Sequence, residues 1–337
     1  MDDVAQRAGV SRALVSLALR GSDKVSDSSR AAVRRAADEL GYRPNLIARH
    51  LASKQTRTFG LLINDLHNPY FPSVADGIKR AADAGGYRLL MNSAFLNDDD
   101  ETRAIETFID YRVDGVILTG SRVSSTVIEQ AARSVPIVVV SRPMDSTVVD
   151  TINNDDFLGA QMVVEHLIEL GHRHICHIDG GRGAGSAQRL AGYQATMHRH
   201  GFAPHVVSAA FTEASGALAA QQALASGRPV TAVFAGNDLS ALGVLDTLDD
   251  SGFTVPGDIS LVGYDNTSVA ALRHIGLTTV DQHREQLGEL AIDALIDRVE
   301  GGRTQAVHRV IAPSLVVRST TAAPRATKTG SQRKFSK

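Results

Sequence analysis

The stretch Asp3-Val4-Ala5-Gln6-Arg7-Ala8-Gly9-Val10-Ser11-Arg12-Ala13-Leu14-Val15-Ser16 predicts a helix, a tight turn and a second helix. Apolar residues in its first half are spaced as one face of a helix. Gly9 follows at the position where a left-handed residue commonly ends a helix. Ser11 stands at the N-cap position of the second helix, where its hydroxyl can accept a backbone N–H of the next turn.

A third helix is expected to follow, over residues 27–40, with Ser26 as its N-cap and Gly41 closing it. Two short helices joined by a glycine-containing turn, and then a third, are typical of a helix-turn-helix. The second helix of this motif, here residues 12–19, is the one that enters the major groove of DNA. The alternative is a generic three-helix fragment with no DNA-binding role.

The charge distribution favours the DNA-binding interpretation. The whole chain of 337 residues has a formal net charge of -2, yet residues 1–57 hold eleven Lys and Arg against six Asp and Glu. The stretch from residue 321 holds five basic residues and no acidic one. A basic end suits a polyanion, because Lys and Arg displace the counterions condensed on DNA. Uneven surface charge without a partner is the alternative.

Three segments together resemble the lactose/galactose repressor (LacI/GalR) family of transcriptional regulators. They are Asp-Val-Ala-x-x-Ala-Gly-Val-Ser from residue 3, Val-Ser from residue 15, and Gly-Tyr-Arg-Pro-Asn-x-x-Ala-Arg-x-Leu from residue 41. The resemblance extends to about residue 320. It implies an all-α headpiece (1–44), a hinge helix and linker (45–58), and a two-lobed α/β effector and dimerisation domain resembling periplasmic binding proteins (59–320). The implied lobes are about 59–152 with 283–313, and about 156–278 with 317–320.

The resemblance also implies the residues that contact DNA. Arg12 and Ala13 would face base edges, and Leu51 would insert into the minor groove from a hinge helix over 45–53, because an apolar wedge between base steps kinks the duplex. A helix of about nine residues is too short to be stable alone, so we expect it to fold only on DNA. Leu17 and Arg20 stand where the family often has Arg and Asn, which leaves the operator sequence open. The full implied set is Ser11, Arg12, Ala13, Ser16, Leu17, Asn45, Ala48 and Leu51.

Beyond the polar linker, buried-strand patterns alternate with helical patterns, which predicts two open parallel sheets in tandem, each covered on both faces. Ligands bind outside the carboxyl ends of such strands, so two units would form a cleft between them. The resemblance implies that the chain crosses between the lobes three times, near 151–156, 278–283 and 313–320. The expected strands are 59–64, 87–93, 113–118, 136–141, 174–179, 205–210, 231–235 and 259–263, and the expected helices are 72–84, 101–111, 124–133, 157–170, 188–200, 214–226 and 239–251.

Polar residues follow several of these strands, and the resemblance implies that some of them bind the effector. Phe71 would pack on it, and the others would form hydrogen bonds with it from both lobes. Carboxylates and amides with a pair of arginines suit a polyhydroxylated ligand such as a sugar. Helix capping is the alternative at each position, above all at Asn237, which opens a predicted helix. The implied set is Phe71, Arg142, Asp155, Arg189, Asn237, Asp265 and Gln282.

No set of residues for catalysis, a metal or a cofactor emerges, so we expect a protein that is not an enzyme. The glycine-rich segment 180–185 lacks a G-x-G-x-x-G spacing and the Lys of a P-loop. His172, His174 and His177 come without a carboxylate or cysteine set, so we interpret them as structural. Cys176 is the only cysteine, which excludes an internal disulfide framework.

We therefore expect a cytoplasmic repressor that binds a palindromic operator as a homodimer and responds to a small-molecule effector, most simply a sugar. Neither a signal peptide nor a membrane span is expected. The segment 321–337 is expected to be a disordered basic tail, and it lacks the leucine heptads of a tetramerising coiled coil. Three alternatives stay open. They are a solute-binding protein of a sugar transporter, a purine- or nucleoside-responsive regulator acting with a co-repressor, and an α/β enzyme acting on sugars.

Overall fold

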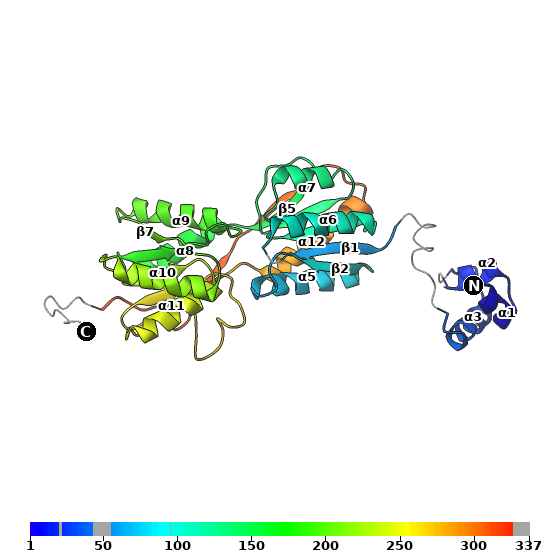
Figure 1. Cartoon of the computed structure of the whole chain (residues 1–337), viewed down its shortest axis with the longest axis horizontal. Helices are drawn as coiled ribbons and strands as arrows, with labels where there is room; N and C mark the ends of the chain where they lie inside the picture. Colours follow the sequence, from blue (N-terminus) through cyan, green and yellow to red (C-terminus); the bar gives the residue numbers. More distant parts are fainter. Residues whose placement is uncertain (20–21, 43–54, 95, 326–337) are drawn as a thin grey trace. The chain divides into compact units, whose positions relative to one another are not determined.

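The computed structural model describes residues 1–19, 22–42, 55–94 and 96–325 of the chain. They form two compact units, residues 1–56 and 57–337, which are labelled by element in Figure 1. The predicted hinge helix over 45–53, with Asn45, Ala48 and Leu51, lies outside the described residues.

The first unit is a three-helix headpiece made of α1 (Asp2–Ala8), α2 (Arg12–Leu19) and α3 (Asp27–Glu39). As the sequence predicts, Gly9 has a left-handed φ of 65° at the end of α1, and the Ser11 hydroxyl accepts the Leu14 N–H at 3.2 Å. Val4, Val15 and Val33, one from each helix, are fully buried in a single small core. Leu40, the last residue of the predicted third helix, is 47% exposed and lies outside this core.

The second unit begins with a six-stranded sheet in the order β11-β5-β4-β3-β1-β2, and every neighbouring pair in it is parallel. Its apolar strands are buried because helices cover both faces. Residues of α5 and α12 pack on one face, and residues of α6 and α7 pack on the other (Figure 1). The strands are β1 (Thr58–Ile63), β2 (Arg88–Ser93), β3 (Gly115–Thr119), β4 (Ile137–Val140), β5 (Asp150–Asn154) and β11 (His308–Ile311), and the helices are α5 (Tyr70–Ala84), α6 (Asp98–Asp110), α7 (Ser125–Ala131) and α12 (Arg284–Val299).

A four-stranded parallel sheet in the order β7-β6-β8-β9 forms the second lobe of this unit. Alternate residues of β6 face opposite sides: Cys176 packs towards α10 and α11, whereas Ile175 packs towards α8 and α9. The two lobes thus repeat the same layered plan. The strands are β6 (Ile175–Ile178), β7 (His205–Val207), β8 (Ala232–Ala235) and β9 (Ser260–Val262), and the helices are α8 (Asp156–Glu169), α9 (Ser186–Arg199), α10 (Glu213–Ala225) and α11 (Asp238–Asp250).

A short antiparallel ladder joins β10 (Thr279–Asp281) to β12 (Ser314–Val316), on the segments that enter α12 and leave β11. Beyond it, residues 321–325 differ from the expected disordered tail. The Ala322 carbonyl accepts hydrogen bonds from the Ser260 hydroxyl at 3.0 Å and lies 2.9 Å from His172 Nε2. The Arg325 guanidinium pairs with Asp258 at 2.5 Å. This segment is therefore held against the second lobe by specific polar contacts.

Candidate functional site

The exposed start of α2 forms the candidate DNA-binding surface of the headpiece. Ser11, Arg12 and Ala13 are exposed, and Ser16 and Leu17 are half-buried. The Arg12 side chain is 70% exposed, with Asp2 3.6 Å away as a weak, solvent-screened partner. Leu17, expected on the same surface, packs partly against the headpiece core. Arg12 is therefore the side chain at this surface with the greatest reach towards a base edge.

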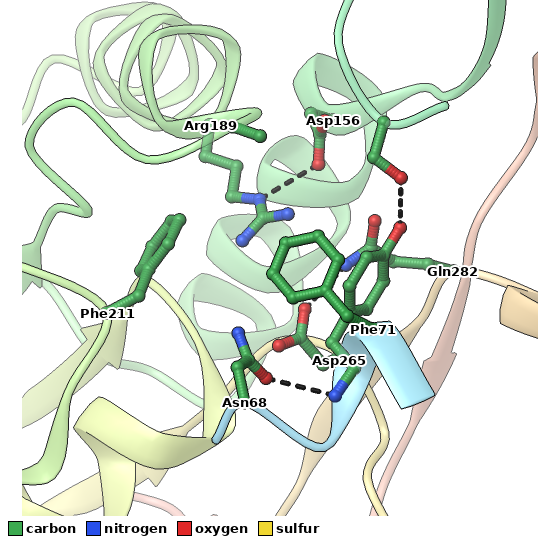
Figure 2. Close-up of a pocket in the computed structure, with 10 residues that line it drawn as sticks. Asn68, Phe71, Asp156, Arg189, Phe211, Asp265 and Gln282 are labelled. Carbon is green, nitrogen blue, oxygen red and sulfur yellow. Dashed lines mark hydrogen bonds and ion pairs between the residues drawn. The ribbon is translucent and has the colours of Figure 1, made fainter. Parts of the chain in front are cut away.

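A second candidate site lies in a cleft between the two lobes of the second unit (Figure 2). The first lobe contributes the loop and helix start at Asn68–Phe71 and the residue after β4. The second lobe contributes the starts of α8 and α9 and the loops after β7 and β9. The lining residues are Asn68, Tyr70, Phe71, Ser141, Asp156, Ala184, Arg189, Phe211, Asp265 and Gln282.

Arg189 organises the wall that the second lobe contributes to the cleft. Its Nε donates to Asp156 Oδ1 at 2.8 Å, and one Nη donates to the Gly236 carbonyl at 2.6 Å. Its guanidinium carbon lies 3.8 Å from the centre of the Tyr264 ring. Burial alone would lower the pKa of Arg189, but Asp156, Tyr264 and Asp265 together outweigh that effect and raise the pKa further above its ordinary value. A buried cation with donors remaining can bind ligand oxygens strongly.

Asp265, which also comes from the second lobe, lines the same cavity as Arg189 (Figure 2). It is 3% exposed and has a left-handed φ of 114°. The Gln282 amide donates to its carboxyl at 2.5 Å. Burial raises the pKa of Asp265, Arg189 opposes the change, and the carboxyl of Asp238 raises it again. The cleft thus presents a carboxyl, an amide and a guanidinium within one polar surface.

Aromatic rings supply the apolar walls of the cleft. Phe71 packs against Gly120, where an added Cβ would lie 2.6 Å from the ring. Phe211 packs against Gly180 and Gly183, where an added Cβ would lie 2.0 Å and 2.3 Å from the ring. Apolar walls with a few directed polar groups are typical of small-molecule sites. The arrangement suits the mixed apolar faces and hydroxyl edges of a small polar ligand.

The structure brings together four of the seven residues implied for effector binding: Phe71, Arg189, Asp265 and Gln282 all line this cavity. The other three make structural contacts and do not line it. They are Arg142, which donates to the Ser121 and Val123 carbonyls, Asp155, which accepts the Leu158 N–H, and Asn237, which forms a capping box with Ser240.

Several lining residues were not among the implied set, and their signals in the sequence differ. Asp156 follows Asp155 directly, so the sequence shows an Asp pair but not which member turns inwards. Asn68 and Tyr70 belong to the polar loop after the first strand, a position that favours ligand contact. Ser141 ends the fourth strand and accepts or donates a hydrogen bond with the Tyr70 hydroxyl at 2.5 Å. Phe211 had no signal, since it lies in a loop beyond a short strand.

Of the three histidines interpreted as structural, His172 and His177 are buried and hydrogen-bonded, whereas His174 is exposed. His172 bonds to Thr231 and Ser260, and His177 Nδ1 lies 2.9 Å from the Phe234 carbonyl. Burial lowers the pKa of His177 to about 4, so it is uncharged near neutral pH. Across the described residues, no group of three or more His, Cys, Asp and Glu side chains is placed to hold a metal ion. None of the described helices combines the length and apolarity needed to cross a membrane.

Comparisons with known proteins agree with both halves of this description. Residues 1–45 match the model of bacterial regulatory proteins of the lacI family, and residues 56–319 match the model of periplasmic binding proteins and the sugar binding domain of the LacI family. The chain is 34% identical over 328 residues to the HTH-type transcriptional repressor PurR of Erwinia tasmaniensis, covering 95% of this chain and 96% of the relative. It is 35% identical over 325 residues to the ribose operon repressor of Escherichia coli, covering 94% and 98%.

Among solved structures, the lac repressor dimer bound to operator and the anti-inducer ONPF is similar. That comparison has a TM-score of 0.86 and 30% sequence identity, and it covers 95% of this chain and 98% of the other. The similarity spans both the headpiece and the two-lobed unit.

Proposed function

Because the chain belongs to the LacI family of bacterial regulatory proteins, we propose that it represses transcription from a palindromic operator as a homodimer under the control of a small polyhydroxylated effector. One observation carries this proposal: a helix-turn-helix headpiece and a two-lobed effector unit lie in a single chain. Two headpieces are needed because the half-sites of such operators lie about one helical turn of DNA apart. As a DNA-binding regulator, it acts in the cytoplasm with the nucleoid.

We assign effector binding to Phe71, Arg189, Asp265 and Gln282, which line one cavity. Of the other residues in the implied set, Asp155 and Asn237 have their polar groups engaged in helix-cap contacts, so we assign them supporting roles. Arg142 does not line this cavity. The relatives support a sugar as the ligand class, since one of them is named the ribose operon repressor. A cleft with both a carboxyl–guanidinium surface and two phenylalanine rings can accommodate a sugar or a nucleobase.

Control of DNA binding follows from unequal affinity of the effector for two relative orientations of the lobes. A ligand shifts an equilibrium only by its difference in affinity for the two states. The cleft residues come from both lobes, so a ligand that contacts both will favour one orientation. That preference is a coupling free energy between cleft and operator, typically about 1–3 kcal/mol.

The test begins with a thermal-shift screen of sugars and nucleosides on the full-length protein, followed by operator binding with and without each hit. We expect at least one hit to change operator affinity by roughly tenfold. Asp265→Ala should abolish the response while leaving effector-free operator binding unchanged, because Asp265 lies in the second unit. If the hit still changed the operator affinity of Asp265→Ala, the assignment of the effector to this cleft would be overturned. Consumption of a hit during incubation would favour the enzyme alternative.

A further inference from the structure

A second cavity, of about 290 Å³, adjoins the effector cleft and is lined by three arginines. Arg122 and Arg142 come from loops at the carboxyl ends of β3 and β4 in the first lobe, and Arg182 comes from the loop before α9 in the second lobe. Most of its other lining residues are small, and none carries a carboxylate. Three guanidinium groups around one cavity, without an acid in its wall, form a surface of positive charge.

Two of these guanidiniums, those of Arg122 and Arg182, have weak partners among the described residues. Arg122 Nε is buried without a hydrogen-bond partner there, and its nearest ion-pair contact is Asp98 Oδ1 at 3.7 Å. The Arg182 side chain is 77% exposed, and its ion-pair contact is also with Asp98, at 3.7 Å. One carboxylate, itself 49% exposed, therefore faces two guanidiniums at distances too long for direct hydrogen bonds. A buried donor left unpaired is costly unless a ligand or water satisfies it.

A second nearby acid, Glu101, is engaged in other hydrogen bonds. It is fully buried and accepts hydrogen bonds from the Ser121 hydroxyl at 2.6 Å and from the Arg122 backbone N–H at 2.9 Å. Glu101 thus fixes the loop that carries Arg122 and does not line the cavity. Arg142 is held in a similar way, since it donates to the carbonyls of Ser121 and Val123. The loop that carries Arg122 and the side chain of Arg142 are therefore positioned by the fold before any ligand binds.

The opposite wall adds backbone donors to these side chains. It is formed by residues 181–185 and the first turn of α9. No side chain caps this helix, and its N-cap is Gly185, with a φ of 79°. An uncapped N-terminus carries partial positive charge and N–H groups that suit an anion. The N-terminus of α9 therefore adds to the positive charge that the three arginines place around the cavity.

The two cavities belong to one continuous cleft. The arginine-lined cavity shares Ala184 with the cavity at Arg189 and Asp265. A third cavity of about 210 Å³ shares Arg122 with the former, and Phe71 and Phe211 with the latter. A ligand in the effector cleft can therefore extend to the arginines without leaving the protein surface.

We propose that the effector is anionic, with a polyhydroxylated part beside Arg189 and Asp265 and a phosphate ester or carboxylate bound by Arg122, Arg142 and Arg182. This inference rests on the proposed function, since it describes the ligand of that same cleft. Phosphorylated sugars and sugar acids both satisfy it. Guanidinium groups bind either anion through paired, charge-assisted hydrogen bonds.

The experiment titrates the full-length protein by isothermal calorimetry with inorganic phosphate, ribose, ribose 5-phosphate, glucose, glucose 6-phosphate and glucuronate. Ionic strength is matched with chloride throughout, because screening alone changes exposed charge interactions. We expect inorganic phosphate to bind with a Kd of about millimolar. We expect at least one anionic sugar to bind roughly tenfold or more tightly than its neutral parent, since hydrogen bonds to charged groups are about twice as strong. The phosphate and glucuronate arms separate the two anion classes.

Two variants of opposite sign test the arginines. Arg182→Gln should remove most of the preference for the anionic sugar, because the Arg182 charge is balanced only weakly, by Asp98 at 3.7 Å, and is therefore available to the ligand. Asp98→Asn should strengthen phosphate binding several-fold, because it removes the carboxylate that lies near both Arg122 and Arg182 and competes with the phosphate. The matched control is Arg273→Gln, an exposed arginine outside all three cavities. It changes net charge equally and should leave both affinities unchanged.

Three outcomes would overturn the inference. They are no binding of phosphate or any anionic sugar, equal or tighter binding of the neutral sugar, and an anion preference that Arg182→Gln and Arg122→Gln both leave intact. Tight binding of a neutral sugar that also alters operator binding would retain the proposed function while rejecting the anionic site. Loss of operator binding in every condition would instead reject the regulator itself.

Discussion

At the scale of single residues, Asp265 shows how the cleft holds a polar group at a cost to the fold. It is nearly fully buried, adopts a left-handed φ of 114°, and accepts a hydrogen bond from Gln282. Burial raises its pKa, and Arg189 only partly opposes that effect. Strain and burial of this kind are found where a ligand makes use of the group.

This raised pKa makes a prediction about stability and pH. Below about pH 4 the carboxyl is protonated in both the folded and the unfolded chain. As the pH rises, the unfolded chain ionises first, so the folded state loses relative stability until the pH passes the raised pKa. Asp265→Asn cannot ionise, so its free energy of unfolding should rise relative to the unsubstituted protein between pH 5 and pH 8. Urea unfolding at the two pH values measures this.

Asp258→Asn is the matched control for that measurement. Hydrogen bonds from Thr254 lower the pKa of Asp258 below its ordinary value, and Arg325 adds to the effect. Its carboxylate is therefore ionised in both states throughout pH 5 to 8, and the stability it contributes is lost only as the pH falls through its lowered pKa. The difference between this variant and the unsubstituted protein should not change across the window. A change as large as that of Asp265→Asn would refute the assignment.

The sequence predicted some of the residues that line the cleft and missed others. The family resemblance implied Arg189 and Asp265, and both line the cleft. Asp155 and Asp156 differ only in which one caps α8 and which turns inwards, and that depends on the rotation of the helix start, which a residue pattern does not determine. Asn237 could be interpreted as either a cap or a ligand. Its capping box with Ser240 leaves it outside the lining of the cavity.

At the scale of secondary-structure elements, helices in both lobes pack through pairs of glycines. In the first lobe a Cβ at Gly77 of α5 would lie 2.2 Å from the Glu285 carbonyl oxygen of α12. In the second lobe a Cβ at Gly243 of α11 would lie 1.9 Å from the Glu213 carbonyl oxygen of α10. The backbones approach so closely that a methyl group does not fit, and both contacts are with backbone atoms that cannot rotate away.

Gly243→Ala should therefore destabilise the protein by about 1–3 kcal/mol, in spite of the higher helix propensity of alanine. The reason is overpacking between α10 and α11. Urea or thermal unfolding measures the loss. Leu218→Ala on α10 is the control, since Leu218 is 59% exposed and its removal should cost less than about 0.5 kcal/mol. Equal stability of Gly243→Ala and the unsubstituted protein would show that the helices can separate freely.

The strands and helices of the tandem units could be predicted because buried apolar runs alternate with helical patterns. Five elements were not predicted: β5, β10, β11, β12 and α12. Of these, α12 does carry buried Leu287, Ala291, Ala294 and Leu295 at helical spacing. β5 reads Asp-Thr-Ile-Asn-Asn and is buried throughout, and its Asp150 is paired with Arg298 and Arg303 at 2.8 Å each. Such polar burial depends on partners about 150 residues away in sequence, so no local pattern can show it.

At the scale of the whole molecule, the headpiece and the two-lobed unit are separate compact units of one chain. A substitution in the headpiece should therefore change operator affinity directly, and a substitution in the two-lobed unit should change effector affinity directly. An effect on the affinity for the other ligand requires the coupling free energy between the two sites. By linkage, the factor by which the effector changes operator affinity equals the factor by which operator changes effector affinity.

Arg12→Ala tests this separation of roles. It should weaken operator binding by roughly tenfold or more, because a specific arginine contact to a base edge is worth about 1–3 kcal/mol. Since Arg12 is exposed in the headpiece, effector affinity measured without DNA should remain as in the unsubstituted protein. In the presence of saturating operator, both proteins should show the same ratio of DNA-bound to DNA-free effector affinity. Calorimetric titrations with and without operator give both quantities. A DNA-free effector affinity altered by Arg12→Ala would mean that the headpiece contributes to the effector site, contrary to an assignment wholly within the second unit.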